Sequence, residues 1–189
     1  MIRQLRETIA RFRRENEAVA AVEFALVLPL LIALYFGSIE ASALFTADRR
    51  INTVSATVGD LFAQWDDDDG SITSATQTNY FQASTALMYP MSTTNLHIVV
   101  SGVTISSTGV TNVVWSRGYN GATPRTVNTT YPLTQSKMMN QVSRTVGFII
   151  ASEVYYPYRP LLGVMFPTSV NLYRENLYIP RYAAALAVQ

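Results

Sequence analysis

The chain has 189 residues, of which 49% are hydrophobic and 14% are charged, and it contains one histidine and no cysteine. The missing cysteines exclude a disulfide scaffold, a Cys-ligated zinc or iron–sulfur site and a thiol nucleophile. Soluble domains carry about 25% charged residues, so the low charge indicates a segment that avoids water. The formal net charge of +1 gives no support to a nucleic-acid binder, which would show a basic face.

An apolar stretch near the N-terminus predicts a membrane-spanning helix. It runs from Val19 to Phe45 and is interrupted only by Glu23 and Glu40. That length is sufficient, because a membrane helix needs about 20 residues at a rise of 1.5 Å each. The arginines that precede it are expected to stay on the cytoplasmic side; they are Arg3, Arg6, Arg11, Arg13 and Arg14. The expected segments are a cytoplasmic basic leader (1–18), a transmembrane helix (19–45) and an extracytoplasmic domain (46–189).

The helical pattern continues past the membrane segment. Apolar residues recur at helical spacings at Ile51, Val54, Val58, Leu61, Phe62 and Trp65. We therefore predict one helix from Val19 to about Trp65, with its first half in lipid and its second half packed on a domain. A secretory signal peptide is the alternative, because Ala41-Ser42-Ala43 has the small residues of a cleavage site. A cut after Ala43 would, however, sever the helix.

Glu23 is the most informative residue of the span, since an unpaired carboxylate at membrane depth costs about 2 to 3 kcal/mol or more. Either its side chain reaches the headgroups, as we also expect of Glu40 at the outer end, or it is paired. The surrounding sequence, Asn16 to Leu26, resembles the cleavage region of Flp-type prepilins and pseudopilins of the type IV pilus superfamily. Their pattern is a glycine, four residues, and Glu followed by Tyr or Phe. Here Ala18 stands at the glycine position and Glu23-Phe24 at the acidic and aromatic positions.

The resemblance implies that a prepilin peptidase cuts between Ala18 and Val19, which makes Glu23 the fifth residue of the mature chain. The cut creates an α-amino group about one helical turn from the Glu23 carboxylate. In pilins this carboxylate is expected to pair with the amine of a neighbouring subunit and to set the axial register, together with the following aromatic residue, here Phe24.

Beyond the long helix, the sequence predicts a small antiparallel sheet and therefore an α+β domain. Asp66 to Asp69, before Gly70, end the long helix, either as a solvated turn or around a cation. Ser71 is the expected cap of a second helix that ends before Pro90. Alternating apolar residues predict a hairpin over 96–105 and 110–115, an irregular connection up to 137, and strands over 147–156 and 170–179.

Parts of this domain resemble TadE-like proteins, which are pseudopilins of the tight-adherence (Tad) pilus system of bacteria. The matching parts are Ser152 to Leu161, Tyr178 to Arg181 and the hairpin end Trp115-Ser116-Arg117. The resemblance implies a pilin-like inner-membrane protein with a periplasmic C-terminal domain, which takes part as a minor component in assembling an adhesive Flp-type pilus. Its implied partners are the prepilin peptidase, other pilins, the pilus assembly platform and membrane lipid, without a cofactor, a metal or nucleic acid.

The aromatic residues around Pro157 have two interpretations. Tyr155, Tyr156 and Tyr158 can pack in the core and at a strand edge that Pro157 blocks. Alternatively, they form a docking surface with Arg159, because Tyr and Arg dominate protein interfaces.

No sequence pattern predicts catalysis. His97 lies in an alternating strand, where a solvated or hydrogen-bonded side chain is the default, because no second histidine or cysteine could complete a metal site with it. The chain has no nucleophile elbow, phosphate-binding loop or dinucleotide fingerprint. We therefore expect a non-enzyme with a structural role. The alternative is an uncleaved single-pass envelope protein whose outer domain binds a partner.

Overall fold

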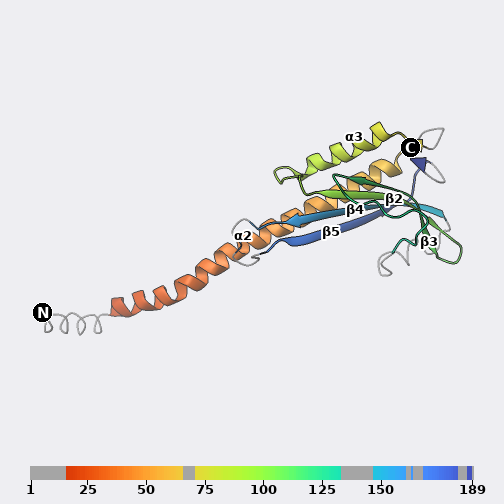
Figure 1. Ribbon diagram of the computed structural model, residues 1–189. Helices are drawn as coiled ribbons and strands as arrows, with labels where there is room; N and C mark the ends of the chain where they lie inside the picture. The colour runs from red at the N-terminus through yellow and green to blue at the C-terminus, as the bar shows by residue number, and fades with distance from the viewer. Residues whose placement is uncertain are drawn as a thin grey trace, which may run out of the picture. The chain divides into compact units, whose positions relative to one another are not determined.

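The computed structural model describes residues 16–65, 71–132, 147–160, 163, 168–182 and 187–188. The helices are α2 (Asn16–Ala63), α3 (Ser74–Thr85) and the 3₁₀ helix η1 (Ala86–Met88). The strands are β1 (Ser71–Ile72), β2 (His97–Ile105), β3 (Thr111–Tyr119), β4 (Gly147–Tyr158), β5 (Val170–Tyr178) and β6 (Ala187–Val188) (Figure 1). The predicted turn or cation site at Asp66 to Asp69 lies outside the described residues.

The chain divides into two compact units. One is Met1–Ala43 with Pro160–Thr168, and the other is Leu44–Arg159 with Ser169–Gln189. Helix α2 contributes to both units, because it is one helix of 48 residues that includes Pro29. The prediction of a single long helix that passes the end of the apolar segment is therefore confirmed.

The C-terminal end of α2 is closed by a distant part of the chain. Helix ends leave backbone carbonyls without intrahelical donors, and here the Arg181 backbone N–H donates to the Ala63 carbonyl oxygen at 2.9 Å. The Arg181 guanidinium also forms an ion pair with Asp60 at 2.5 Å. The helix therefore ends against the segment that follows β5.

A four-stranded antiparallel sheet has the order β3-β2-β4-β5, and β1 and β6 form a separate parallel pair. Strand β2 pairs with β3 through Ile98 and Tyr119, and with β4 through His97 and Tyr155. The long apolar helix, the antiparallel sheet and the short helix confirm the α+β prediction.

Helix α2 covers one face of this sheet, which we call the inner face, and the principal core lies between them. The apolar side chains at helical spacing on α2 meet the apolar side chains at alternate positions of the strands, as both periods require. They are Ile51, Val54, Val58 and Phe62 from α2, and Ile98, Val100, Trp115, Phe148, Ile150 and Val154 from the sheet. The opposite, outer face has a smaller cluster of Val103, Ile105, Val113, Tyr131, Ile149 and Ala151.

A β-bulge in β3 changes the face of the sheet on which its side chains lie. Gly102 of β2 pairs with Trp115, but the next residue, Val103, pairs with Val113, so Val114 is the extra residue. Trp115 consequently packs on the inner face, whereas Val113, only two residues away, packs on the outer face.

Gly59 marks the closest approach of α2 to the sheet. A Cβ atom at this position would lie 2.5 Å from Tyr178 Cδ2 and 3.2 Å from Ser152 Cβ. We expect Gly59→Ala to lower the free energy of unfolding by about 1 to 2 kcal/mol, because overpacking exceeds the gain in helix propensity. Chemical denaturation checks this result, and the loss should shrink in a Tyr178→Val background. An unchanged loss in that background would contradict the assigned contact.

The predicted start of the second helix is wrong. Ser71 is not its cap but belongs to β1, where it pairs with Ala187. The cap is Thr73, whose hydroxyl oxygen accepts a hydrogen bond from the Thr76 N–H at 3.3 Å. Sequence spacing permits either residue, and the pairing of Ser71 with a distant strand decides between them.

Candidate functional site

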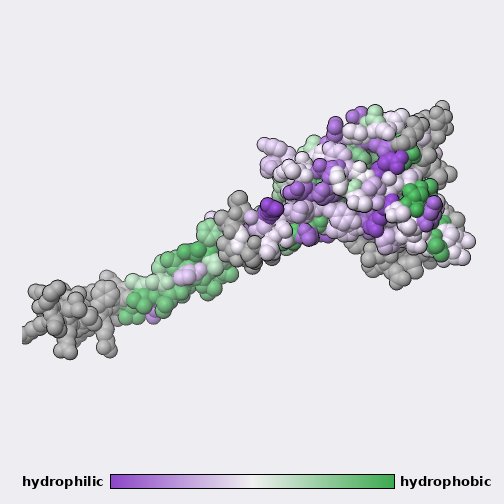
Figure 2. Space-filling view, viewed as in Figure 1, coloured by the Kyte–Doolittle hydropathy of each residue, from purple (hydrophilic) through white to green (hydrophobic). Residues whose placement is uncertain are grey.

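The N-terminal part of α2 presents an uncovered apolar surface. Every residue from Val19 to Phe36 is exposed, including Leu26 at 76% and Leu34 at 62%. Figure 2 shows this part of the helix as a hydrophobic surface. At 1.5 Å per residue these residues measure about 27 Å, close to the thickness of a bilayer's hydrocarbon core. Of the described residues, α2 is the one helix long and apolar enough to cross a membrane, which indicates membrane anchoring.

Glu23 is the single charged residue of that exposed stretch, and its side chain is exposed like those of its neighbours. The following Phe24 is 60% exposed. The Ala18–Val19 peptide bond lies inside α2, two residues after the first described helical residue, Asn16. A peptidase that cuts this bond must therefore act on a terminal turn of the helix.

Glu40 does not extend to solvent or headgroups as predicted. Its exposed fraction is 2%, whereas the large apolar residue beside it, Ile39, is 42% exposed. A carboxylate buried to this degree is held by protein groups, which is the physical reason that the snorkelling prediction is wrong. The uninterrupted run of exposed residues consequently ends at Phe36, because the next residue, Gly37, is also buried.

The aromatic residues around Pro157 occupy different environments. Tyr158 is 7% exposed and Arg159 is exposed. Tyr155 is 39% exposed and contacts Tyr173 in a tilted arrangement with ring centroids 4.8 Å apart. Tyr156 is half-buried and packs against the principal core. Because β2 begins opposite Tyr155, Pro157 lies where β4 is paired with β5 alone in the sheet. The placement fits the interpretation of Pro157 as an edge residue, and the docking surface stays a prediction.

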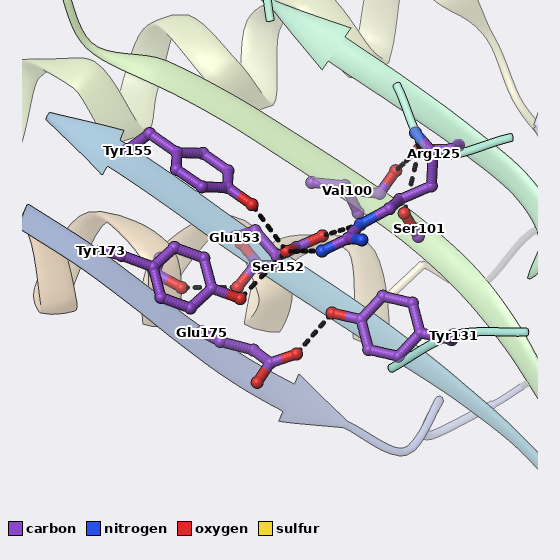
Figure 3. A network of polar contacts seen from close by, with 11 residues as sticks. Val100, Ser101, Arg125, Tyr131, Ser152, Glu153, Tyr155, Tyr173 and Glu175 are labelled. Atoms are coloured by element: carbon purple, nitrogen blue, oxygen red, sulfur yellow. Dashed lines mark hydrogen bonds and ion pairs between the residues drawn. The ribbon is translucent and has the colours of Figure 1, made fainter. Parts of the chain in front are cut away.

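A buried carboxylate on the outer face organises a polar network that the sequence analysis missed (Figure 3). Glu153 is fully buried, and Arg125 donates to both of its oxygens, from Nε at 2.9 Å and from Nη2 at 2.5 Å. The hydroxyls of Tyr155 and Tyr173 donate to Glu153 Oε1, each at 2.9 Å. The Glu153 charge is therefore neutralised by one cation and shared among four hydrogen bonds.

The surroundings of Glu153 favour neutral tyrosines and a charged arginine. Burial, followed by the Glu153 charge, raises the pKa of Tyr173 and the pKa of Tyr131 above the ordinary tyrosine value. The hydrogen bond to Glu153 raises the pKa of Arg125. Tyr131 also donates to Glu175, and its ring lies 5.3 Å from the Arg125 guanidinium carbon. The network consequently attaches the segment around Arg125 to the sheet by ionic and aromatic contacts.

An open pocket of about 590 Å³ lies beside this network and is lined in part by His97, Arg125 and Tyr155. His97 is hydrogen-bonded, as predicted: its Nδ1 lies 2.7 Å from the Asn120 carbonyl oxygen. Within the described ranges, no group of three His, Cys, Asp or Glu residues is arranged to hold a metal ion. Arg125 contributes positive charge to the lining of this pocket, but it is already paired with Glu153.

The sequence contained one signal for the network. Glu153 is the single charged residue in the apolar strand from Gly147 to Tyr158, and a carboxylate in such a strand needs a cation when both faces are covered. Its partner, Arg125, is 28 residues away in a segment without regular structure, so the pair could not be identified from spacing.

Comparison with known proteins gives one match. Residues 18–59 match the family model described as TadE-like protein. No curated protein and no solved structure matches the chain. The matched residues include the predicted cleavage position with Glu23, the exposed apolar surface and most of the part of α2 that packs on the sheet. Residues 18–59 are therefore similar to TadE-like proteins, which is consistent with a pilin-type protein of the Tad system.

Proposed function

We propose that the chain is a minor pilin-type subunit that a prepilin peptidase cuts between Ala18 and Val19 and that helps to assemble an adhesive Tad pilus. The observation that carries this proposal is the exposed apolar helix surface from Val19 to Phe36, with Glu23 as its single charge, inside the TadE-like segment. An apolar surface of this size requires a membrane or other helices to cover it. A subunit that moves from a bilayer into an assembly has this surface covered first by lipid and then by other helices.

The role of the subunit is structural rather than catalytic. The apolar helix supplies lateral cohesion with lipid and then with other pilin helices, and Glu23 supplies register by pairing with a neighbouring α-amino group. The arginines before the span support a cytoplasmic N-terminus, and the unit that contains the sheet then lies on the periplasmic side of the inner membrane. The other components of the pilus are its expected partners.

Ala18 keeps a second candidate function open, because it stands where the prepilin pattern has glycine. An uncleaved chain would be a single-pass envelope protein whose sheet-containing unit binds a partner. It would retain the arginine-rich leader and would have no free α-amino group near Glu23.

N-terminal sequencing of the protein from the membrane fraction tests the proposal. We expect the sequence to begin at Val19. A sequence that begins at Met1 would instead support the uncleaved envelope protein, and one that begins at Leu44 would indicate a secretory signal peptide. Ala18→Gly is the matched variant, because it restores the prepilin pattern and should leave the cleavage site unchanged while increasing the processed fraction.

A further inference from the structure

Strand β5 runs along α2 in the same direction as the helix, and its antiparallel neighbour β4 runs toward the helix N-terminus. The side chain of Asn176 on β5 donates to Asn52 at 3.2 Å, and two residues earlier Arg174 pairs with Asp48 at 2.5 Å. The last residues of β4 pair with the first residues of β5, as in Tyr158 with Val170. Arg159, which follows β4, therefore lies at the end of the sheet where β4 finishes and β5 begins.

The chain after η1 is held at the same level of α2. Arg50 donates from Nη1 to the carbonyl oxygen of Leu87 at 3.0 Å and to that of Tyr89. Arg50 is two residues from Asp48, which carries the contact to β5. Three elements therefore lie toward the same end of the unit Leu44–Arg159 with Ser169–Gln189: the first turns of α2 in that unit, the turn after η1, and the end of β4. Arg159 is five residues beyond Val154, which pairs with Arg174.

Several exposed side chains toward this end are aromatic or basic, and we call Phe45, Arg49, Tyr89 and Arg159 the rim. Thr46, Leu87 and Asn171 are exposed there as well. Tyr89 is 81% exposed and Phe45 is 67% exposed. Arg49 and Arg159 are exposed, and among the described residues neither side chain has a hydrogen-bond or ion-pair partner. The nearby carboxylate of Asp48 is already paired with Arg174, so the rim carries uncompensated positive charge.

This combination matches the interfacial zone of a bilayer. Aromatic rings concentrate at the level of the headgroups, and basic residues close to an anionic surface are attracted to lipid phosphates. The rim also follows the apolar run directly in the sequence. Phe45 is the last residue of that run, and Arg49 is about one helical turn further along α2. The residues that follow Arg159 contain no charge up to Tyr173.

We propose that the rim binds the phospholipid headgroups of the bilayer that α2 crosses, with Arg49 and Arg159 on phosphates and with Phe45 and Tyr89 at the boundary with the acyl chains. The contact limits the tilt of the sheet-containing unit on the membrane before assembly. This inference rests on the membrane anchoring in the proposed function. It assigns Arg159 to lipid rather than to a protein partner.

Lipid-level quenching in the full chain tests the rim directly. The chain has no cysteine, so a fluorophore can be attached to a single introduced cysteine in protein reconstituted in phosphatidylglycerol and phosphatidylethanolamine vesicles. We expect nitroxide headgroup lipids to quench a label at Tyr89→Cys. They should not quench a label at Ser107→Cys, an exposed position in the turn between β2 and β3, at the opposite end of β2 from His97. Equal quenching at the two positions would overturn the proposal.

Charge variants test the arginines, and a third label separates this inference from the anchoring itself. In the Tyr89→Cys background, changing Arg49 and Arg159 to Glu should abolish most of the quenching, whereas changing both to Lys should retain it. Quenching that survives in the Glu variant would refute the phosphate contacts. A label at Leu34→Cys should be quenched by acyl-chain nitroxides; if it is not, the anchoring and the rim both fail. If Leu34 is quenched and Tyr89 is shielded only when other pilus proteins are added, the rim binds protein and the lipid proposal fails alone.

Discussion

Cells that carry Glu23→Ala should insert the protein in the membrane and process it, yet the number of pili should fall to background. Glu23 is the single charge on an exposed apolar surface of 18 residues, so no other side chain there can pair with a neighbouring α-amino group. Two unit charges 4 Å apart attract by about 4 kcal/mol at an effective dielectric constant of about 20. We expect the loss of this proposed contact to prevent incorporation of the subunit.

The measurement is a count of pili by electron microscopy, with membrane fractionation and N-terminal sequencing on the same cells. Glu23→Gln, which preserves size and removes charge, should behave like Glu23→Ala, whereas Glu23→Asp should retain part of the activity. Normal piliation in the alanine variant would eliminate the register role of Glu23. Normal piliation in the glutamine variant alone would show that a hydrogen bond is sufficient.

Glu153→Ala is expected to lower the free energy of unfolding by about 3 kcal/mol, with a decrease of roughly 6 to 12 °C in Tm. The substitution removes a fully buried carboxylate and leaves Arg125 without its ion-pair partner. The hydroxyls of Tyr155 and Tyr173 lose their acceptor as well, and unsatisfied donors at partly buried positions are costly. The exposure of the Arg125 side chain, 33%, keeps the loss below that of a fully buried pair.

Thermal unfolding of the detergent-solubilised chain measures this effect, followed by the fluorescence of Trp115 in the principal core and of Trp65, which packs against it. Glu175→Ala is the matched control, because Glu175 is only partly buried and accepts a hydrogen bond from Tyr131 in the same network. Glu175→Ala should lower the free energy of unfolding by at most about half as much as Glu153→Ala does. Equal losses for the two variants would show that Glu153 is not the centre of the network.

The elements with strong local periodicity could be predicted from the sequence. Apolar residues at helical spacing identified α2 as one helix, and it ends at Ala63, within two residues of the predicted end. Alternation identified the strands, although β4 and β3 extend further than the alternation indicated. These predictions succeed because the apolar residues that face the core recur with the period of the helix or strand that carries them.

The remaining features depend on contacts between distant residues. The pair of β1 with β6 joins two strands of two residues each, which leave no periodic signal, and this pairing displaced the predicted helix cap from Ser71 to Thr73. The Glu153–Arg125 pair links a strand to an irregular segment. For the proposed assembly site, the sequence motif predicts Ala18, Val19 and Glu23, and the structure adds that Val19 and Glu23 lie on the exposed part of α2.

The bulge at Val114 determines which side chains of β3 face each side of the sheet. Residues before Val114 contribute to the cluster without α2, and residues after it contribute to the cluster with α2. Val114 therefore resets the parity of the strand, in the sense that odd-numbered positions exchange faces when it is passed. Conservative replacement of its side chain, which is 42% exposed, preserves this parity, whereas deletion of the residue would exchange inside for outside along one half of the strand.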